Sequence, residues 1–249
     1  MQGRRRPRAN HLGVIRVIAG ALLSAGVAFA AERRAALTVS GAWAAAVVGT
    51  LLVLAGWRWL ALVGVFFVTS SILTRIDAPR RSSDRRGRRW QQVAANGGIA
   101  ALAAVGYAAT GWPPAFGVAA GSIAAATADT WATEAGRWSR SVPRLITTGR
   151  PVEPGASGGV TALGTAASVC GALFIAAAAV ALDHTSMAHR GAWPAWIAAA
   201  GISGSLFDSV LGATIEGRVS WLDNDAVNVA ATAWGAAVML CAGSPQAVR

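Results

Sequence analysis

The chain contains no lysine, and every basic side chain other than histidine is an arginine. A Walker A phosphate loop needs a lysine, so this kind of nucleotide site is excluded. The only two cysteines, Cys170 and Cys241, fall in apolar segments, where we expect small core residues and no structural disulfide. His184 and His189 lie in one polar loop and His11 in the basic N-terminal segment, so we expect solvated surface residues and no zinc site.

Charged residues are also scarce: 13% of the 249 residues are charged, 54% are hydrophobic, and the mean hydropathy is +0.47. The apolar residues fall in long blocks, which is typical of a polytopic membrane protein. Alanine and glycine dominate these blocks and favour close helix packing. We expect an all-α polytopic membrane protein with about seven or eight transmembrane helices, over residues 12–31, 36–55, 57–74, 92–110, 113–129, 158–182, 192–212 and 226–242.

The net charge of +11 does not indicate a nucleic-acid partner, because seven arginines between residues 75 and 89 lie in one loop between two apolar blocks. A cytoplasmic loop of a bacterial-type inner membrane protein explains them better. We expect one transmembrane domain (12–242) between a basic N-terminal tail (1–11) and a C-terminal tail (243–249). Alternating the helices places four loops in the cytoplasm: 32–35, 75–91, 130–157 and 213–225.

The same alternation places the basic N-terminal tail on the opposite side, against the positive-inside rule. Either the first apolar block does not span the membrane, or this tail is an exception to the rule. The residues leave both alternatives open.

Two segments of the chain suggest a repeated helical hairpin. Asn96-Gly97-Gly98 and Ser157-Gly158-Gly159 each open an apolar block, which leads through a Trp-Pro pair to a second block and an aspartate, Asp129 or Asp208. If the repeat is real, these two aspartates face each other across a shared cleft. The alternative is that such pairs recur by chance in alanine-rich helices. We expect hairpin repeats, related by an axis along the membrane normal, over about 92–134 and 157–216, with a weaker copy over about 36–75.

Polar residues gather near the cytoplasmic ends of the expected helices, whereas the loops on the other side are plain. Ionisable groups near membrane depth are costly and usually face a bundle interior or a wet cavity. We therefore expect one polar site that opens to the cytoplasm. Its candidate residues are Asn96, Asp129, Glu134, Arg144, Ser157, Asp208, Glu216, Asp225 and Asn228.

The acids of this set predict a Mg²⁺ site with Asp129, Glu134, Asp208 and Asp225 as candidate ligands, because Mg²⁺ favours carboxylate oxygens, waters and substrate phosphates. Asp129 and Glu134 are five residues apart. On a regular helix they point about 140° apart, so both reach one ion only if the helix ends or unwinds between them. The alternative is that each acid caps a helix or pairs with a loop arginine.

The loop VPRLITTGRPVEPGASGGV (142–160) predicts a phosphate site, since Arg144 and Arg150 precede a glycine-rich turn that leads into a helix. Free backbone amides at Ser157, Gly158 and Gly159, with the helix dipole, would form an anion cradle. The same reasoning applies to Asn96-Gly97-Gly98. Before the last helix, Asp225 and Asn228 share a helical face, and Asn224 lies beside them. Arg144 is the candidate phosphate clamp.

Five ordered motifs resemble those of the integral membrane family that includes transmembrane protein 19 and the plastid phytyl-phosphate kinase of tocopherol synthesis. The resemblance covers about residues 40–240 and extends to the wider group of membrane polyprenol kinases. The motifs are QQVAANGG (91–98), ADTWATEAG (128–136), PRLITT with PVEPGASGGV (143–160), GSLFDSVLGATIEG (204–217) and LDNDAVN (222–228).

This resemblance implies a Mg²⁺-dependent kinase of prenyl lipid metabolism, which transfers a phosphoryl group from a nucleoside triphosphate, with CTP favoured, to an isoprenoid monophosphate such as phytyl phosphate. It places the catalytic acids on Asp129, Glu134 and Asp208. The asparagines of the family's motifs correspond to Asn96 in QQVAANGG and to Asn224 and Asn228 in LDNDAVN. The chain departs from the family pattern at Ala156-Ser157, where relatives often have Thr-Asn, and at Glu216, where many have Gln.

Three alternatives remain at the level of the sequence. The acceptor could be a prenyl alcohol, or the reaction could be a cytidylyl transfer to a lipid phosphate at the same site. A cation-coupled transporter is the non-enzymatic alternative, because transporters also use hairpin repeats. The clustering of the acids at one membrane face favours the kinase over the transporter.

Overall fold

The computed structural model describes residues 8–77, 87–183, 191–219 and 221–242. Most of the arginine-rich loop, His184, His189 and both chain termini lie outside these residues. Within them the chain forms eight helices and one two-stranded hairpin, which confirms the predicted all-α polytopic fold. The elements are α1 (Arg8–Arg33), α2 (Val39–Ala55), α3 (Trp57–Asp77), α4 (Trp90–Thr110), α5 (Ala115–Gly136), β1 (Arg144–Leu145), β2 (Gly159–Val160), α6 (Ala162–Leu182), α8 (Trp193–Thr214) and α9 (Asn224–Ala242).

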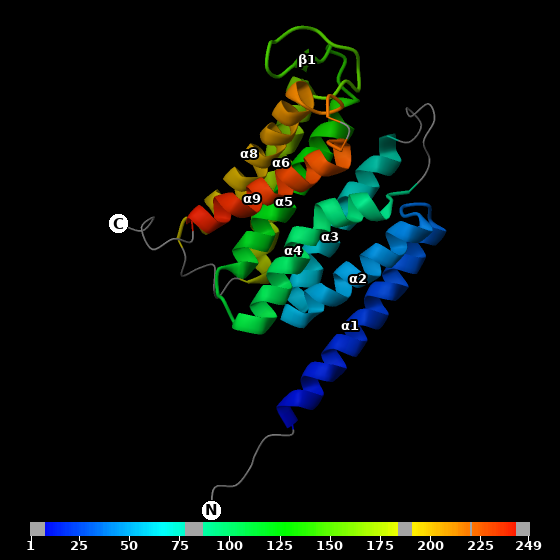
Figure 1. The fold of residues 1–249 in the computed structure, drawn as a ribbon, viewed down its shortest axis with the longest axis vertical. Coiled ribbons are helices and arrows are strands. Elements are labelled where there is room, and N and C mark those ends of the chain that lie inside the picture. Colours follow the sequence, from blue (N-terminus) through cyan, green and yellow to red (C-terminus); the bar gives the residue numbers. More distant parts are fainter. Residues whose placement is uncertain (1–7, 78–86, 184–190, 220, 243–249) are drawn as a thin grey trace, which may run out of the picture.

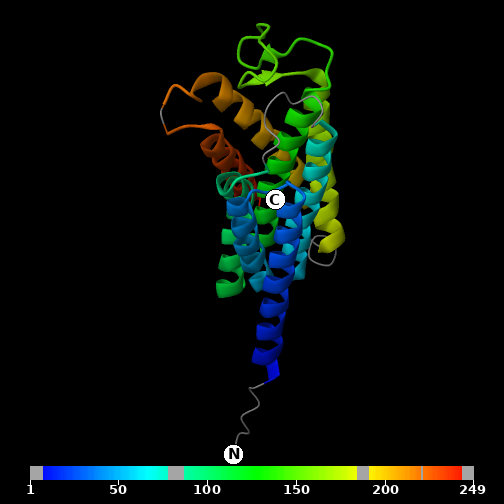
Figure 2. The ribbon, with the colours of Figure 1, turned by 90° about the vertical axis from the view of Figure 1, so that its right-hand side faces the viewer.

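Six of these helices, α1, α3, α4, α6, α8 and α9, are long and apolar enough to cross a membrane. The α2 helix is apolar but shorter. As Figure 1 shows, α1, α3, α5 and α8 all run towards the end of the molecule that carries the β1–β2 hairpin, and α1 stops furthest from it. The first turns of α1 project from the opposite end, beyond the other helices (Figure 2).

The α5 helix lies at the centre of the bundle and packs against α3, α4, α6, α8 and α9. Every residue from Ala115 to Ala128 is buried. This run consists mainly of alanine and glycine, whose small side chains let neighbouring helices approach closely. The central position of α5 brings its polar C-terminal turns, with Asp129 and Glu134, into contact with the ends of the surrounding helices.

A close backbone approach to α5 occurs at Gly121, which meets Gly235 of α9. A Cβ atom at Gly121 would lie 2.6 Å from the Gly235 carbonyl oxygen and 2.5 Å from the Met239 Cγ atom. Replacing Gly121 by alanine should therefore lower the free energy of unfolding by about 1–3 kcal/mol, the usual cost of overpacking. Thermal unfolding in detergent measures this effect.

The matched control is Gly106→Ala on α4, because a Cβ atom there meets nothing within 4 Å. Alanine also has the higher helix propensity, so this variant should unfold at the wild-type temperature or slightly above it. Equal unfolding temperatures for the Gly121 and Gly106 variants would contradict the close contact between α5 and α9.

The structure corrects two predicted helix boundaries. The helix predicted from residue 158 begins at Ala162, because Gly158 has a positive φ of 75° and the Thr161 side chain caps the helix by accepting a hydrogen bond from the Gly164 N–H. The helix predicted to end at residue 129 continues to Gly136. Asp129 and Glu134 therefore lie on one uninterrupted helix, so the unwinding that would let both reach one ion is absent.

The prediction that both cysteines are core residues was wrong. Cys170 and Cys241 are free thiols on exposed faces of α6 and α9. In a membrane protein the outer faces of helices are also apolar, so a hydrophobic sequence does not separate the core from the lipid-facing surface.

Candidate functional site

A polar cavity of about 440 Å³ lies where α3 and α5 finish and where α4 and α9 begin. Five of the predicted site residues line it: Asn96 from α4, Asp129 and Glu134 from α5, and Asn224 and Asn228 from α9. Four arginines also line it, Arg34, Arg75, Arg88 and Arg137, together with Gln92 and the hydroxyl side chains of Ser71, Thr74, Thr130 and Thr133.

Asp129 and Asp208 come together at this end of the bundle, as the hairpin pattern predicts. Their carboxyl groups lie within reach of a mutual hydrogen bond, and Glu216 is close enough to interact electrostatically with both. Two carboxylates at this separation repel each other unless a proton or a cation lies between them. The pair is therefore a place where positive charge is favoured.

Aromatic contacts hold the helices that carry this pair. Phe207, next to Asp208 on α8, stacks on Trp234 of α9 with ring centroids 4.7 Å apart. Trp131, near Asp129 on α5, stacks on Phe174 of α6 with centroids 5.5 Å apart. Both tryptophans thus fix a neighbouring helix beside an acid of the pair.

Glu134 is buried and held by its own partners. The Thr74 hydroxyl donates a hydrogen bond of 2.7 Å to Oε1, and the Arg137 guanidinium pairs with Oε2 at 3.0 Å. These contacts tie the end of α3 to α5 beside the cavity. The arrangement matches the alternative in which a single acid pairs with a nearby arginine.

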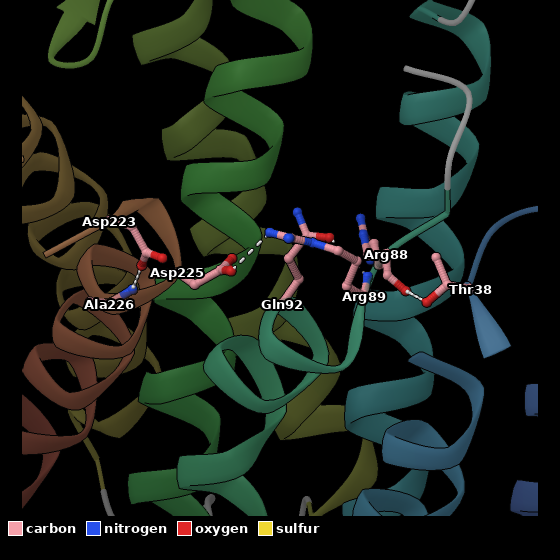
Figure 3. Close-up of polar contacts among 7 residues, drawn as sticks. All are labelled: Thr38, Arg88, Arg89, Gln92, Asp223, Asp225 and Ala226. Atoms are coloured by element: carbon pink, nitrogen blue, oxygen red, sulfur yellow. Dashed lines mark hydrogen bonds and ion pairs between the residues drawn. The ribbon is translucent and has the colours of Figure 1, made fainter. Parts of the chain in front are cut away.

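Asp225, another predicted metal ligand, forms an ion pair with Arg89 at 3.2 Å. Figure 3 shows this pair as a link between the start of α4 and the start of α9. In the same region, Asp223 caps α9 by accepting a hydrogen bond from the Ala226 N–H. Asp225 therefore joins two helices and does not lie with the carboxyl pair.

The four predicted metal ligands therefore do not form one site. Within the described ranges, no group of three or more His, Cys, Asp or Glu side chains is placed to hold a metal ion. The structure brings together Asp129 and Asp208, because they come from facing helices, and separates Glu134 and Asp225, because each has an arginine partner.

The segment before α4 is fixed against the turn between α1 and α2. The Arg88 N–H donates to the Ala36 carbonyl, and the Arg88 carbonyl accepts hydrogen bonds from the Thr38 N–H and hydroxyl (Figure 3). Gly41 makes this contact possible, since a Cβ atom there would collide with the Arg88 carbonyl. The Arg88 side chain is consequently placed at the cavity wall.

The anion cradle predicted at Asn96-Gly97-Gly98 does not form. The free amides of a helix belong to its first turn, and α4 begins at Trp90. The three residues lie in the second turn and beyond, where the N–H groups bond within the helix. Only the Asn96 side chain reaches the cavity.

The predicted phosphate loop lies outside the polar cavity. Arg144 is exposed and donates a 2.8 Å hydrogen bond to the Gly149 carbonyl of its own loop, and Arg150 is also exposed. Gly158 packs against the backbone of Ala213 near the end of α8. The Gly159 N–H donates to the Ala156 carbonyl, and Ser157 is exposed.

Sequence reasoning missed the cavity arginines, above all Arg88. It is one of seven arginines in the loop between residues 75 and 89, and no motif distinguishes it from the others. Gln92 could have been found, because it lies four residues before Asn96 and so shares its helical face.

A second cavity, of about 400 Å³, lies beside the first between α1, α2, α3 and α4. Its walls are almost entirely apolar. Three residues, Arg88, Gln92 and Asn96, line both cavities. The polar and apolar cavities therefore meet at the start of α4.

Comparison with known proteins supports the family indicated by the motifs. The chain is 36% identical to Protein PGR of Arabidopsis thaliana over 234 residues, which cover 81% of this chain and 79% of the plant protein. It is 34% identical over 227 residues to an uncharacterized membrane protein of Methanocaldococcus jannaschii, with 89% and 92% covered.

An uncharacterized membrane protein of a Synechocystis strain is 32% identical over 194 residues, or 74% of each chain. No solved structure matches the chain. The sequence profile of the integral membrane protein family DUF92 matches residues 22–236. The chain therefore belongs to this integral membrane family.

Proposed function

We propose that the protein is a membrane kinase that transfers a phosphoryl group from CTP or another nucleoside triphosphate to an isoprenoid monophosphate and forms the diphosphate. Phytyl and geranylgeranyl phosphates are the acceptor type. The polar cavity would face the cytoplasm of a bacterial-type inner membrane, where nucleotides are available. The arginines in the loops at this end fit that orientation.

The observation that carries the proposal is the composition of the polar cavity. Asp129, four arginines and three asparagines line it at one end of an apolar bundle, and Asp208 lies beside Asp129. Phosphoryl transfer depends mainly on positioning and on neutralising charge, with little covalent chemistry from the protein. Arginine and amide side chains suit phosphate oxygens, and the adjoining apolar cavity suits a lipid acceptor.

The residues also fit the Mg²⁺ that the family resemblance implies. Mg²⁺ in phosphoryl-transfer sites is usually held by one or two carboxylates together with waters and substrate phosphates. Asp129 and Asp208 would supply these two carboxylates, and their proximity favours a cation. When bound, Mg²⁺ would neutralise charge on the phosphates.

The protein's own side chains would bind and orient the acceptor phosphate. Arg88, Gln92 and Asn96 would hold the acceptor phosphate at the junction of the two cavities, and Asn224 and Asn228 would orient it from α9. The attacking oxygen belongs to a phosphate that is already ionised, so no strong general base is required. An alcohol acceptor would need such a base, so the monophosphate is the better acceptor for this set of residues.

An arginine comparison tests which cationic group binds phosphate. Arg88→Ala should lower kcat/KM for the acceptor by about tenfold to a hundredfold, the usual loss of a charged hydrogen bond. Arg144→Ala should have a much smaller effect, because that side chain is exposed and bonded to its own loop. Steady-state kinetics in detergent measure kcat/KM for both variants. A larger loss in Arg144→Ala than in Arg88→Ala would identify Arg144 as the phosphate-binding arginine.

The reaction itself is tested by incubating the purified protein with geranylgeranyl monophosphate, CTP and Mg²⁺ and measuring the mass of the lipid product. An added phosphoryl group is the expected result, and an added CMP group would identify a cytidylyltransferase. Conversion of geranylgeraniol in place of its monophosphate would identify a prenol kinase. No conversion with any nucleotide by folded protein would overturn the proposal and favour transport.

A further inference from the structure

We propose that the apolar cavity between α1, α2, α3 and α4 binds the hydrocarbon chain of a lipid phosphate acceptor, and that Gly64 determines the chain length that fits. This inference rests on the proposed function for the identity of the headgroup chemistry. It assigns a substrate-binding role to α1, α2 and α3, which carry none of the five sequence motifs.

The junction of the two cavities has the chemistry of a boundary between headgroup and chain. The Arg88 guanidinium lies over the rings of Phe66 and Phe67, 5.6 and 6.0 Å from their centroids. Cation–π contacts of this kind hold a charge at the edge of an apolar region. Gln92 and Asn96 complete the junction from α4. A ligand with an anionic head and one long apolar chain would occupy both cavities, whereas a soluble nucleotide would occupy only the polar one.

The packing of the helices leaves this space between them. The α3 helix packs mainly on α5 and contacts α2 less; it meets α4 at one end, where the Trp59 ring lies 5.5 Å from the Tyr107 ring. The α1 helix packs mainly against α2. Helices α1 and α3 therefore form opposite walls without closing on each other, and a lipid chain would enter from the bilayer between them. A volume of about 400 Å³ lies in the range of roughly 300–1,000 Å³ that is typical of ligand pockets.

Shape must decide which chain binds. A hydrocarbon chain that moves from the bilayer into an apolar cavity gains little from the hydrophobic effect, since both surroundings are apolar. Selection therefore depends on how much of the chain the cavity accommodates. Gly64 lines the cavity about one helical turn from Phe67, and a Cβ atom at Gly64 would meet nothing within 4 Å. A larger side chain at this position would take up the free space.

The variant Gly64→Phe tests the inference. It should lower kcat/KM for geranylgeranyl monophosphate by about tenfold relative to isopentenyl monophosphate, whose chain is short. Gly106→Phe is the matched control, because Gly106 also has open space around it but lines neither cavity. An unchanged ratio in Gly64→Phe would contradict the assignment.

Photolabelling gives a second readout that needs no turnover. Geranylgeranyl monophosphate with a diazirine at the far end of its chain should label the segment 52–60, where Leu52, Trp57 and Leu60 line the cavity. Unlabelled geranylgeranyl monophosphate should compete, and Gly64→Phe should reduce the labelling. Labelling of α6, α8 or α9 at the same level in the wild type and in Gly64→Phe would overturn the inference.

The two readouts separate this inference from the proposed function. If the diazirine probe labels segment 52–60 in wild type but no diphosphate forms, the chain-binding cavity stands and the kinase assignment fails. If diphosphate forms while the label lies elsewhere and the chain-length ratio is unchanged, the kinase assignment stands and the cavity assignment fails.

Discussion

Asp129→Asn should reduce phosphoryl transfer to geranylgeranyl monophosphate by about a hundredfold or more, because it removes one of the two carboxylates that would hold the cation that neutralises the phosphates. The substitution keeps the shape of the side chain and its reach to Asp208. It abolishes the negative charge that, with Asp208, would favour a bound cation. The rate of diphosphate formation at saturating CTP and Mg²⁺ measures the loss, and Asp208→Asn should cause a similar one.

Asp223→Asn is the matched control for this substitution. Asp223 is exposed at the same end of the molecule and caps α9 through the Ala226 N–H. Asparagine is an equally good cap, so this variant should keep the wild-type rate and stability. If folded Asp129→Asn transferred the phosphoryl group at the wild-type rate, the carboxyl pair would have no part in the mechanism.

Arg58→Ala should be the most destabilising substitution at the end of the bundle opposite the polar cavity. Arg58 at the start of α3 pairs with Asp183 at 2.6 Å, and the Asp183 side chain is only 5% exposed. The same guanidinium lies over the Phe116 and Tyr107 rings. Leaving a buried carboxylate unpaired costs about 3–5 kcal/mol, so thermal unfolding in detergent should occur at a much lower temperature.

The double variant Arg58→Met with Asp183→Leu separates the lost ion pair from lost packing. Replacing both partners of a buried pair by apolar groups is often neutral, so the double variant should recover most of the stability. Its folded fraction should also retain phosphoryl transfer, because the pair lies far from the polar cavity. A double variant as unstable as Arg58→Ala would show that the charge pair is not the cause.

The sequence predicted the helices well, because long apolar blocks have few other solutions in a membrane. The errors lie at the polar ends of helices, where hydrophobicity is uninformative. The helix predicted to end at residue 129 continues to Gly136 because the polar turn is enclosed by neighbouring helices. The helix predicted from residue 158 starts at Ala162 because a glycine turn and the Thr161 cap precede it.

Part of the candidate site was also predictable from the sequence. Asn96, Asp129 and Asn228 meet in one cavity, and the alternating topology of the helices already indicated that all three lie at the same end of the bundle. The partner of each charge was not predictable, since Asp225 pairs with an arginine from another helix. The apolar cavity was invisible in the sequence, because its walls have the same composition as tightly packed helices.

The most direct test of the account is to follow the terminal phosphate of labelled CTP in the wild type and in Thr133→Trp. Thr133 is exposed, lines the polar cavity and lies one turn after Asp129 on the same face of α5, so tryptophan there would obstruct the cavity without entering the core. Thr110→Trp, exposed at the other end of the bundle, is the control. We predict that label passes to geranylgeranyl monophosphate in wild type and Thr110→Trp but not in Thr133→Trp. Undiminished transfer by Thr133→Trp, or no transfer by the wild type, would contradict the assignment of phosphoryl transfer to this cavity.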